Sequence, residues 1–163
     1  MSSNFLIPFK HDTISVKRDD GLTLAEFPRN LFYFNQKSEI IMGAWESKPA
    51  KAKKIDIHRV METGKFPDFF GTDYRRVEAH RLQRNQIFAY CNLPDSEFVL
   101  GKRGTFLVTT SDGNRVRKDF ANTLVFFAQA RIKQIVFSLY PFSSGGEWYQ
   151  SGQYRVALNH RPS

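Results

Sequence analysis

Apolar and polar residues alternate with a period of two along much of the chain, as in β-strands, whose successive side chains point to opposite faces. In residues 105–110, Thr-Phe-Leu-Val-Thr-Thr, an extended chain places Phe106 and Val108 on one side, which predicts a strand. Asp112 and Gly113 follow, and glycine supplies the positive φ that a tight turn needs. We therefore predict a hairpin in which residues 115–118 return as the partner strand.

The most apolar run, residues 123–140, changes the phase of its alternation near residues 131–134. A shift of one residue exchanges the two faces of a strand, so this run predicts two strands joined by a turn or bulge. A helix over residues 120–134, with Asp119 as its N-cap, is the alternative, because the same apolar residues also fit a 3.6-residue period. The β-branched and aromatic content favours the strands.

The chain closes on a predicted strand at residues 152–158, which contains a Tyr-x-Val-x-Leu pattern with its apolar side chains facing inward. Trp148 and Gly152 precede that pattern, and the combination resembles the closing strands of immunoglobulin-like sandwiches. The resemblance covers about a third of the chain and implies an architecture, not an activity.

The first 47 residues predict a meander of short strands separated by turn sequences. Pro8 marks the first of them as an edge strand, because proline cannot donate a ladder hydrogen bond. The predicted strands are Phe5–Phe9, Thr13–Val16, Leu22–Ala25, Leu31–Phe34 and Glu39–Trp45.

The middle of the chain changes in composition, beginning with four lysines and a proline in seven residues. We predict, in order, a solvated loop at Lys48–Lys54, a short helix at Ile55–Gly64, a loop at Lys65–Asp73 that inserts Phe69 and Phe70 into the core, a charged strand at Tyr74–Arg84 and a buried strand at Gln86–Leu93.

These elements predict a mainly β protein, or an α+β protein with one or two short helices, built as an antiparallel β-sandwich with an immunoglobulin-like C-terminal part. A chain of 163 residues with 41% hydrophobic residues is long enough for a single domain with a real core. The composition also permits a subdivision into an N-terminal β meander (1–47), a loop with a short helix (48–71) and the sandwich (72–163).

The charge is strongly basic: 24 Lys and Arg against 16 Asp and Glu give +8. That balance favours an anionic partner, although a basic protein without such a partner remains the alternative. Cys91 is the only cysteine, so no intrachain disulfide can form. We see no signal sequence and no apolar run of about 18 residues, and we expect a soluble cytoplasmic protein.

The usual signatures of catalysis are missing: no phosphate-binding glycine loop, no nucleophile elbow and no zinc-site spacing. His58 and Glu62 would lie four apart on the predicted helix, where a surface pair is the simpler interpretation. A dyad of Cys91 and His80 could arise only through the fold. We predict no cofactor and no metal site, and we do not predict an enzyme.

The leading hypothesis is a non-catalytic basic binding module that contacts nucleic acid, DNA or RNA, or another anionic partner. Its cations would follow a phosphate backbone, and Tyr74 would stack on an unpaired base. The predicted cationic residues are Lys51, Lys53, Lys54, Arg75, Arg76, Arg81 and Arg84.

Two alternatives stay open. The first is a protein-protein assembly or adaptor module, including a homo-oligomer, which pairs through an exposed edge strand or an apolar patch near Trp148 and Tyr149. The second is an enzyme or small-ligand-binding protein whose site forms only in the folded chain.

Overall fold

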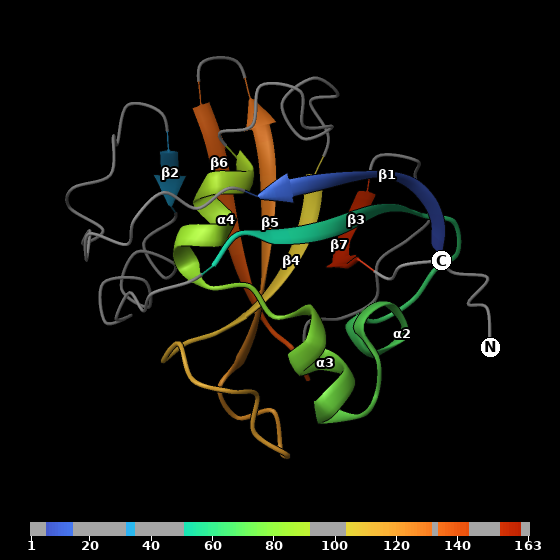
Figure 1. Ribbon diagram of the computed structural model, residues 1–163, viewed down its shortest axis with the longest axis vertical. Coiled ribbons are helices and arrows are strands. Elements are labelled where there is room, and N and C mark those ends of the chain that lie inside the picture. The colour runs from blue at the N-terminus through green and yellow to red at the C-terminus, as the bar shows by residue number, and fades with distance from the viewer. Residues whose placement is uncertain are drawn as a thin grey trace.

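The strands form one sheet in a computed structural model that describes residues 6–14, 32–34, 51–91, 104–131, 134–143 and 154–160. The sheet has seven strands in the order β1-β3-β7-β4-β5-β6-β2. In Figure 1, β1 and β3 run across the view while β4, β5 and β6 run along it, so the sheet twists strongly between its edges. The strands are β1 (Leu6–Ile14), β2 (Phe32–Phe34), β3 (Lys53–Val60), β4 (Gly104–Thr110), β5 (Thr123–Arg131), β6 (Gln134–Pro141) and β7 (Tyr154–Asn159).

The sheet is mixed, which corrects the expectation of a purely antiparallel arrangement. Four neighbouring pairs are antiparallel, but β2 lies parallel to β6 and β4 lies parallel to β7. The protein is mostly β, as predicted. The described strands belong to a single sheet, and neither a two-sheet sandwich nor an immunoglobulin-like pattern is confirmed.

The prediction of two strands in the most apolar run is confirmed. β5 and β6 pair antiparallel from Leu124 with Pro141 to Arg131 with Gln134, which excludes the helix proposed over residues 120–134. The predicted strands at 105–110 and 152–158 are also present, as β4 and β7. Residues 115–118 are not the partner strand of β4, because β5 takes that place.

The two described N-terminal strands do not form a meander. β1 and β2 lie at opposite edges of the sheet, separated by five other strands. β1 is an edge strand among the described residues, as Pro8 predicted, and its register with β3 shifts between Pro8 and Lys10. The strands predicted at 22–25 and 39–45 lie outside the described residues, as do Trp148 and Gly152.

The prediction of a helix at residues 55–64 is wrong, because β3 occupies most of that segment. Ile55 and Ile57 are buried, whereas Asp56 and His58 are only partly buried. This alternation has the period of two that is typical of a strand. β3 hydrogen-bonds to β1 on one side and β7 on the other, so both edges of its backbone are satisfied.

The two strands expected between residues 74 and 93 are wrong: both segments are helical. α3 (Tyr74–His80) begins at Asp73, whose side chain accepts the Arg75 backbone N–H at 3.0 Å. α4 (Arg84–Cys91) begins where the Gln86 side chain accepts the Gln83 backbone N–H at 2.7 Å, one half of a capping box.

A third, shorter helix, α2 (Phe66–Phe70), lies within the expected loop 65–73. The Asp68 carboxylate accepts the Lys65 backbone N–H at 2.7 Å and starts the single turn. Phe69 and Phe70 are buried in the core, as predicted.

The sheet has helices against both of its faces. Phe106 of β4 contacts the rings of Phe66 and Phe69, which places α2 on one face. The hydroxyls of Thr105 and Tyr90 lie 3.3 Å apart, which places α4 on the other face, because neighbouring strand residues point to opposite sides. All seven residues of β4 are therefore buried, including three threonines as well as Phe106, Leu107 and Val108.

The link between α3 and α4 passes from one face of the sheet to the other. β4 pairs with β7 only from Gly104 to Phe106. Beyond that point Leu82 takes the place of a strand: its N–H donates to Val108 O at 2.9 Å, and Thr109 Oγ1 donates to Leu82 O at 2.7 Å. We call residues 81–83 the crossing segment.

Gly104 yields a first prediction, because a Cβ there would lie 1.9 Å from Cζ of Phe127. The ring cannot move aside freely, since it packs on Phe106 at 4.6 Å and Tyr154 at 5.6 Å between ring centroids. Gly104→Ala should lower the free energy of unfolding by about 1–3 kcal/mol, measured by urea denaturation. In a Phe127→Leu background that cost should shrink; the same cost in both backgrounds would contradict the packing described.

Candidate nucleic-acid interface

The first turn of α3 and the β4–β5 loop meet around the ring of Tyr74. The Arg75 guanidinium carbon lies 5.5 Å from the ring centroid, and its Nε donates to the Tyr74 hydroxyl at 3.3 Å. Lys118, from the loop, places Nζ 5.9 Å from the same centroid. Two cations from distant parts of the sequence thus face one aromatic ring, which attracts both through its quadrupole.

Arg76 and Arg117 are exposed neighbours of Arg75 and Lys118 in the sequence. Arg76 follows Tyr74 by two residues, which directs its side chain to another side of the helix. We call Tyr74, Arg75 and Lys118 the cationic patch.

Nearby residues also affect the charge around the cationic patch. Arg115 is a further exposed cation of the same loop, while Asp73 and Asp119 are exposed and partly offset the charge. The balance of the exposed side chains remains basic.

The β4–β5 loop, residues 111–122, is held in shape by hydrogen bonds within it. Asn122 is 4% exposed; its Nδ2 donates to Asp112 Oδ1 and Arg115 O, and its Oδ1 accepts the Arg117 N–H. Gly113 has the positive φ, 72°, that the Asp-Gly sequence predicted.

The far end of the loop is anchored by an aromatic contact. Phe120 also has a positive φ, 59°, a conformation rare outside glycine. Its ring packs on the ring of Phe142, with 4.7 Å between the ring centroids. The loop is thus preorganised over its length.

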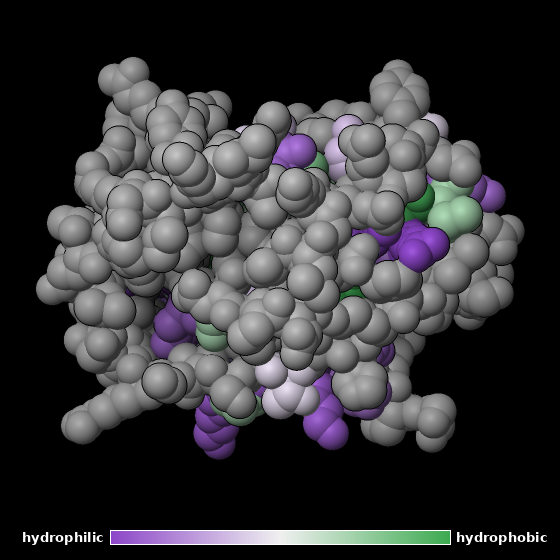
Figure 2. Space-filling model, turned by 90° about the horizontal axis from the view of Figure 1, so that it is seen from above, coloured by the Kyte–Doolittle hydropathy of each residue, from purple (hydrophilic) through white to green (hydrophobic). Residues whose placement is uncertain are grey.

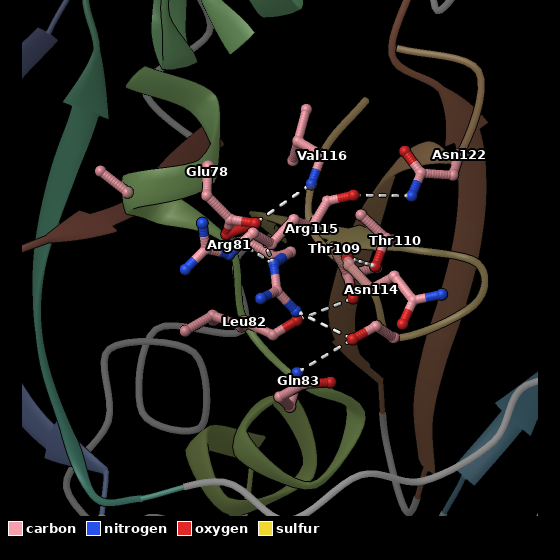
Figure 3. Close-up of polar contacts among 12 residues, drawn as sticks. Glu78, Arg81, Leu82, Gln83, Thr109, Thr110, Asn114, Arg115, Val116 and Asn122 are labelled. Carbon is pink, nitrogen blue, oxygen red and sulfur yellow. Dashed lines mark hydrogen bonds and ion pairs between the residues drawn. The ribbon is translucent and has the colours of Figure 1, made fainter. Parts of the chain in front are cut away.

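Helix α3 and the crossing segment clamp this loop from the side, as Figure 3 shows. Both carboxylate oxygens of Glu78 accept from Arg81 Nε, at 2.9 and 2.7 Å, and one of them also accepts the Val116 backbone N–H at 3.1 Å. Arg81 Nη1 and Gln83 Nε2 both donate to the carbonyl of Gly113, at 3.3 and 3.2 Å. This clamp fixes where the loop presents Lys118.

The predicted site residues separate into three groups. Tyr74, Arg75 and Arg76 lie in the first turn of α3, where Arg75 contacts the Tyr74 ring and both arginines are exposed. Arg81 is committed to Glu78 and Gly113, and Arg84 is 4% exposed, so neither presents its charge freely to solvent.

The three predicted lysines lie at the opposite end of α3. Lys51 and Lys54 are exposed, whereas Lys53 is half-buried and donates to the carbonyls of Ala79 and Arg81. Lys53 and Lys54 belong to β3 rather than to a loop. The structure therefore joins Lys53 to the end of α3 and does not join the lysines to Tyr74.

Sequence reasoning missed Lys118 as a partner of Tyr74. Residues 115–118 were expected to form a strand, and the contact of Lys118 with α3 spans more than forty residues. The Asp112-Gly113 signal did indicate a turn there, but no local pattern indicated that the turn opens a long loop.

The described side chains of His58, His80 and His160 do not form a catalytic group. His80 Nδ1 accepts the Asn159 backbone N–H at 2.9 Å, and His160 Nδ1 lies 2.8 Å from Asp56 Oδ1. Burial lowers the pKa of His58, against a smaller opposing effect of Asp56. The side chain of Cys91 lies outside the described ones, so the Cys91–His80 hypothesis is not tested.

Among the described His, Cys, Asp and Glu side chains, no group of three is arranged to hold a metal ion. Within the same ranges, no helix is both long and apolar enough to cross a bilayer. In Figure 2, the described hydrophilic side chains project from the margin and the hydrophobic ones show only as small areas. On that face the described residues present no broad apolar surface.

Comparison of the chain with protein-family models, with curated proteins and with solved structures found no significant match.

The clamp yields a second prediction, since Glu78 is the acceptor that ties α3 to the loop. Glu78→Ala leaves the Val116 N–H without that acceptor, and an unsatisfied donor of this kind costs about 1–3 kcal/mol. Hydrogen exchange at the Val116 amide should accelerate, and the free energy of unfolding should fall by that amount.

Glu62→Ala is the matched control, because Glu62 is an exposed glutamate in the same part of the chain. It should leave both quantities unchanged. Unaltered exchange at Val116 in Glu78→Ala would show that the clamp does not hold the loop.

Proposed function

We propose that the protein is a non-catalytic binding module that contacts the phosphate backbone of a nucleic acid through the cationic patch. The single observation that carries the proposal is the convergence of Arg75 and Lys118 on the ring of Tyr74. Phosphate contacts from Arg and Lys supply most of the sequence-independent affinity of nucleic-acid-binding proteins.

The local geometry supports a site prepared in advance of binding. Two like charges repel each other, and the electron-rich face of one ring offsets part of that repulsion. A phosphate bound between the two cations would offset the remaining repulsion between them. The loop that carries Lys118 is already held by Asn122 and Glu78, so binding would not have to order it.

Tyr74 has a different role in this proposal from the one expected on sequence grounds. Its ring is half-buried and has a cation from each of two elements near it. We propose that it orients Arg75 and Lys118 rather than stacking on a base. The affinity would then depend on charge and only weakly on base identity.

The experiment is a titration of a fluorescently labelled single-stranded oligonucleotide at several sodium chloride concentrations. Arg75→Gln/Lys118→Gln should weaken binding on the order of tenfold at low salt, because two phosphate contacts and their release of counterions are lost. Loss of two phosphate contacts should also reduce the slope of log affinity against log salt by about 1–2.

Lys51→Gln/Lys54→Gln is the matched control, since it removes the same charge from exposed positions at the other end of α3. It should retain most of the affinity and slope. Equal losses of affinity in the two double variants would show that binding depends on net charge and not on the cationic patch. An affinity that does not change with salt concentration would exclude a phosphate contact.

A further inference from the structure

The cationic patch holds hydrogen-bond donors that the rest of the described protein does not use. Arg75 Nε donates to the Tyr74 hydroxyl at 3.3 Å, and the two Nη groups of that guanidinium make no hydrogen bond within the described residues. Lys118 Nζ lies 5.9 Å from the centroid of the Tyr74 ring and has no hydrogen bond or ion pair within those residues. Because the Tyr74 hydroxyl accepts from Arg75, its own proton remains available to another acceptor.

These donors are open to solvent, and the acidic side chains that adjoin them in sequence do not occupy them. Arg75 and Lys118 are both exposed, so an anion reaches them from the surface without a cavity. Asp73 Oδ1 accepts the Arg75 backbone N–H and Asp119 Oδ1 accepts the Ala121 backbone N–H, each at 3.0 Å. Neither of these described carboxylates forms an ion pair with either cation. Two positive charges therefore remain available to an external anion.

The exposed cations of the described residues do not extend the patch into a track. Arg76 lies on another side of α3, and Lys51 and Lys54 lie at the opposite end of that helix. Arg115 and Arg117 are exposed in the loop but make no cation–π contact with the Tyr74 ring. A strand bound along its length needs cations placed along its path. The patch instead offers its charges at one ring, which suits one phosphate.

The donors of the patch match the oxygens of a phosphate that has three of them free. The two Nη groups of Arg75 form a planar fork, which suits two oxygens of one phosphate. Lys118 supplies a point charge on a flexible stem, so it can reach a third oxygen without a fixed geometry. The Tyr74 hydroxyl proton is a further donor beside the guanidinium.

We propose that the cationic patch binds the terminal phosphate of a nucleic-acid strand in preference to the phosphodiesters along it. A terminal phosphate is a monoester with three free oxygens and a charge of about −1.5 to −2 at neutral pH. A phosphodiester has two free oxygens and a single charge, so it offsets only one of the two cations. This inference rests on the proposed function and specifies which phosphate of the nucleic acid is bound.

The test compares the affinities of single strands that carry a fluorescent label at the 3′ end, in a phosphate-free buffer at low salt. A strand with a 5′-phosphate should bind on the order of tenfold more tightly than the same strand with a 5′-hydroxyl. A 5′-hydroxyl strand two nucleotides longer has nearly the same total charge as the phosphorylated strand, and it should recover little of that gain. If it recovers the whole gain, the inference is wrong and the proposed function stands. If none of the three strands binds, both are wrong.

Two double variants show whether the preference belongs to the cationic patch. Arg75→Gln/Lys118→Gln should remove most of the preference for the phosphorylated strand, whereas Lys51→Gln/Lys54→Gln should keep it. All four residues are exposed, and circular dichroism checks that both variants are folded. A preference that survives in folded Arg75→Gln/Lys118→Gln, or that is lost equally in both variants, would contradict the inference. The charge-matched strands on the unaltered chain decide the matter if a variant does not fold.

The pH supplies a readout that comes from the ligand. A phosphate monoester takes up its second proton with a pKa of about 6, so the preference should decline as the pH is lowered from about 7.5 to about 5. Titration elsewhere in the protein affects both strands alike and cancels in the ratio of their affinities, and the patch itself contains no histidine. A ratio that stays constant over this range would show that the second charge is not recognised, against the inference.

Inorganic phosphate, used as a competitor, distinguishes a strand end from the free ion. The free ion should displace the labelled phosphorylated strand only at concentrations far above those at which the unlabelled phosphorylated strand displaces it, because the ion lacks the rest of the strand. Displacement by the two competitors at equal concentrations would assign the patch to free phosphate and would overturn the inference.

Discussion

The structure depends on the crossing segment, residues 81–83, which completes β4 where β7 no longer pairs with it. The Leu82 N–H donates to the Val108 carbonyl, as a neighbouring strand would, and the Leu82 carbonyl accepts from the Thr109 hydroxyl. Buried backbone groups must be paired, which leaves the chain little freedom at this point. The segment before it forms α3 on one face of the sheet, and the segment after it forms α4 on the other.

The crossing segment also determines which cations remain at the surface. Arg81 lies within it and its guanidinium is used to hold Glu78 and Gly113. Arg84, just beyond it, is buried at the start of α4. Arg75 and Arg76 lie in the first turn of α3 and stay exposed. The fold thus separates the basic residues into those that hold the structure together and those that present their charge at the surface.

The strands that could be predicted are those whose apolar pattern is local and complete. The phase change near residues 131–134 was enough to separate β5 from β6, and the turn at Gly113 needed only its own sequence. Between residues 53 and 91 the local pattern indicated the wrong elements. Asp73 and Gln86 are the side chains that start α3 and α4, and their capping role was overlooked.

The candidate site could be predicted only in part, because its two halves lie far apart in the chain. Tyr74, Arg75 and Arg76 were expected to act together; all three lie in the first turn of α3, and Arg75 contacts the Tyr74 ring. The loop that carries Lys118 is held beside α3 by contacts such as that of Glu78 with Val116, which spans 38 residues and which no local pattern encodes. Lys53 is a similar case: its carbonyl partners, Ala79 and Arg81, lie 26 and 28 residues away.

Hydrogen exchange at the Leu82 amide tests the account most directly. Leu82 lies in a short connection between two helices. An exposed amide at this position would exchange as fast as the amides of the exposed residues around it. The account predicts protection of the Leu82 amide comparable to that of the β4 amides, because it is bonded into the sheet at Val108. Exchange as fast as at exposed Thr72 would contradict the crossing and the division of cations that follows from it.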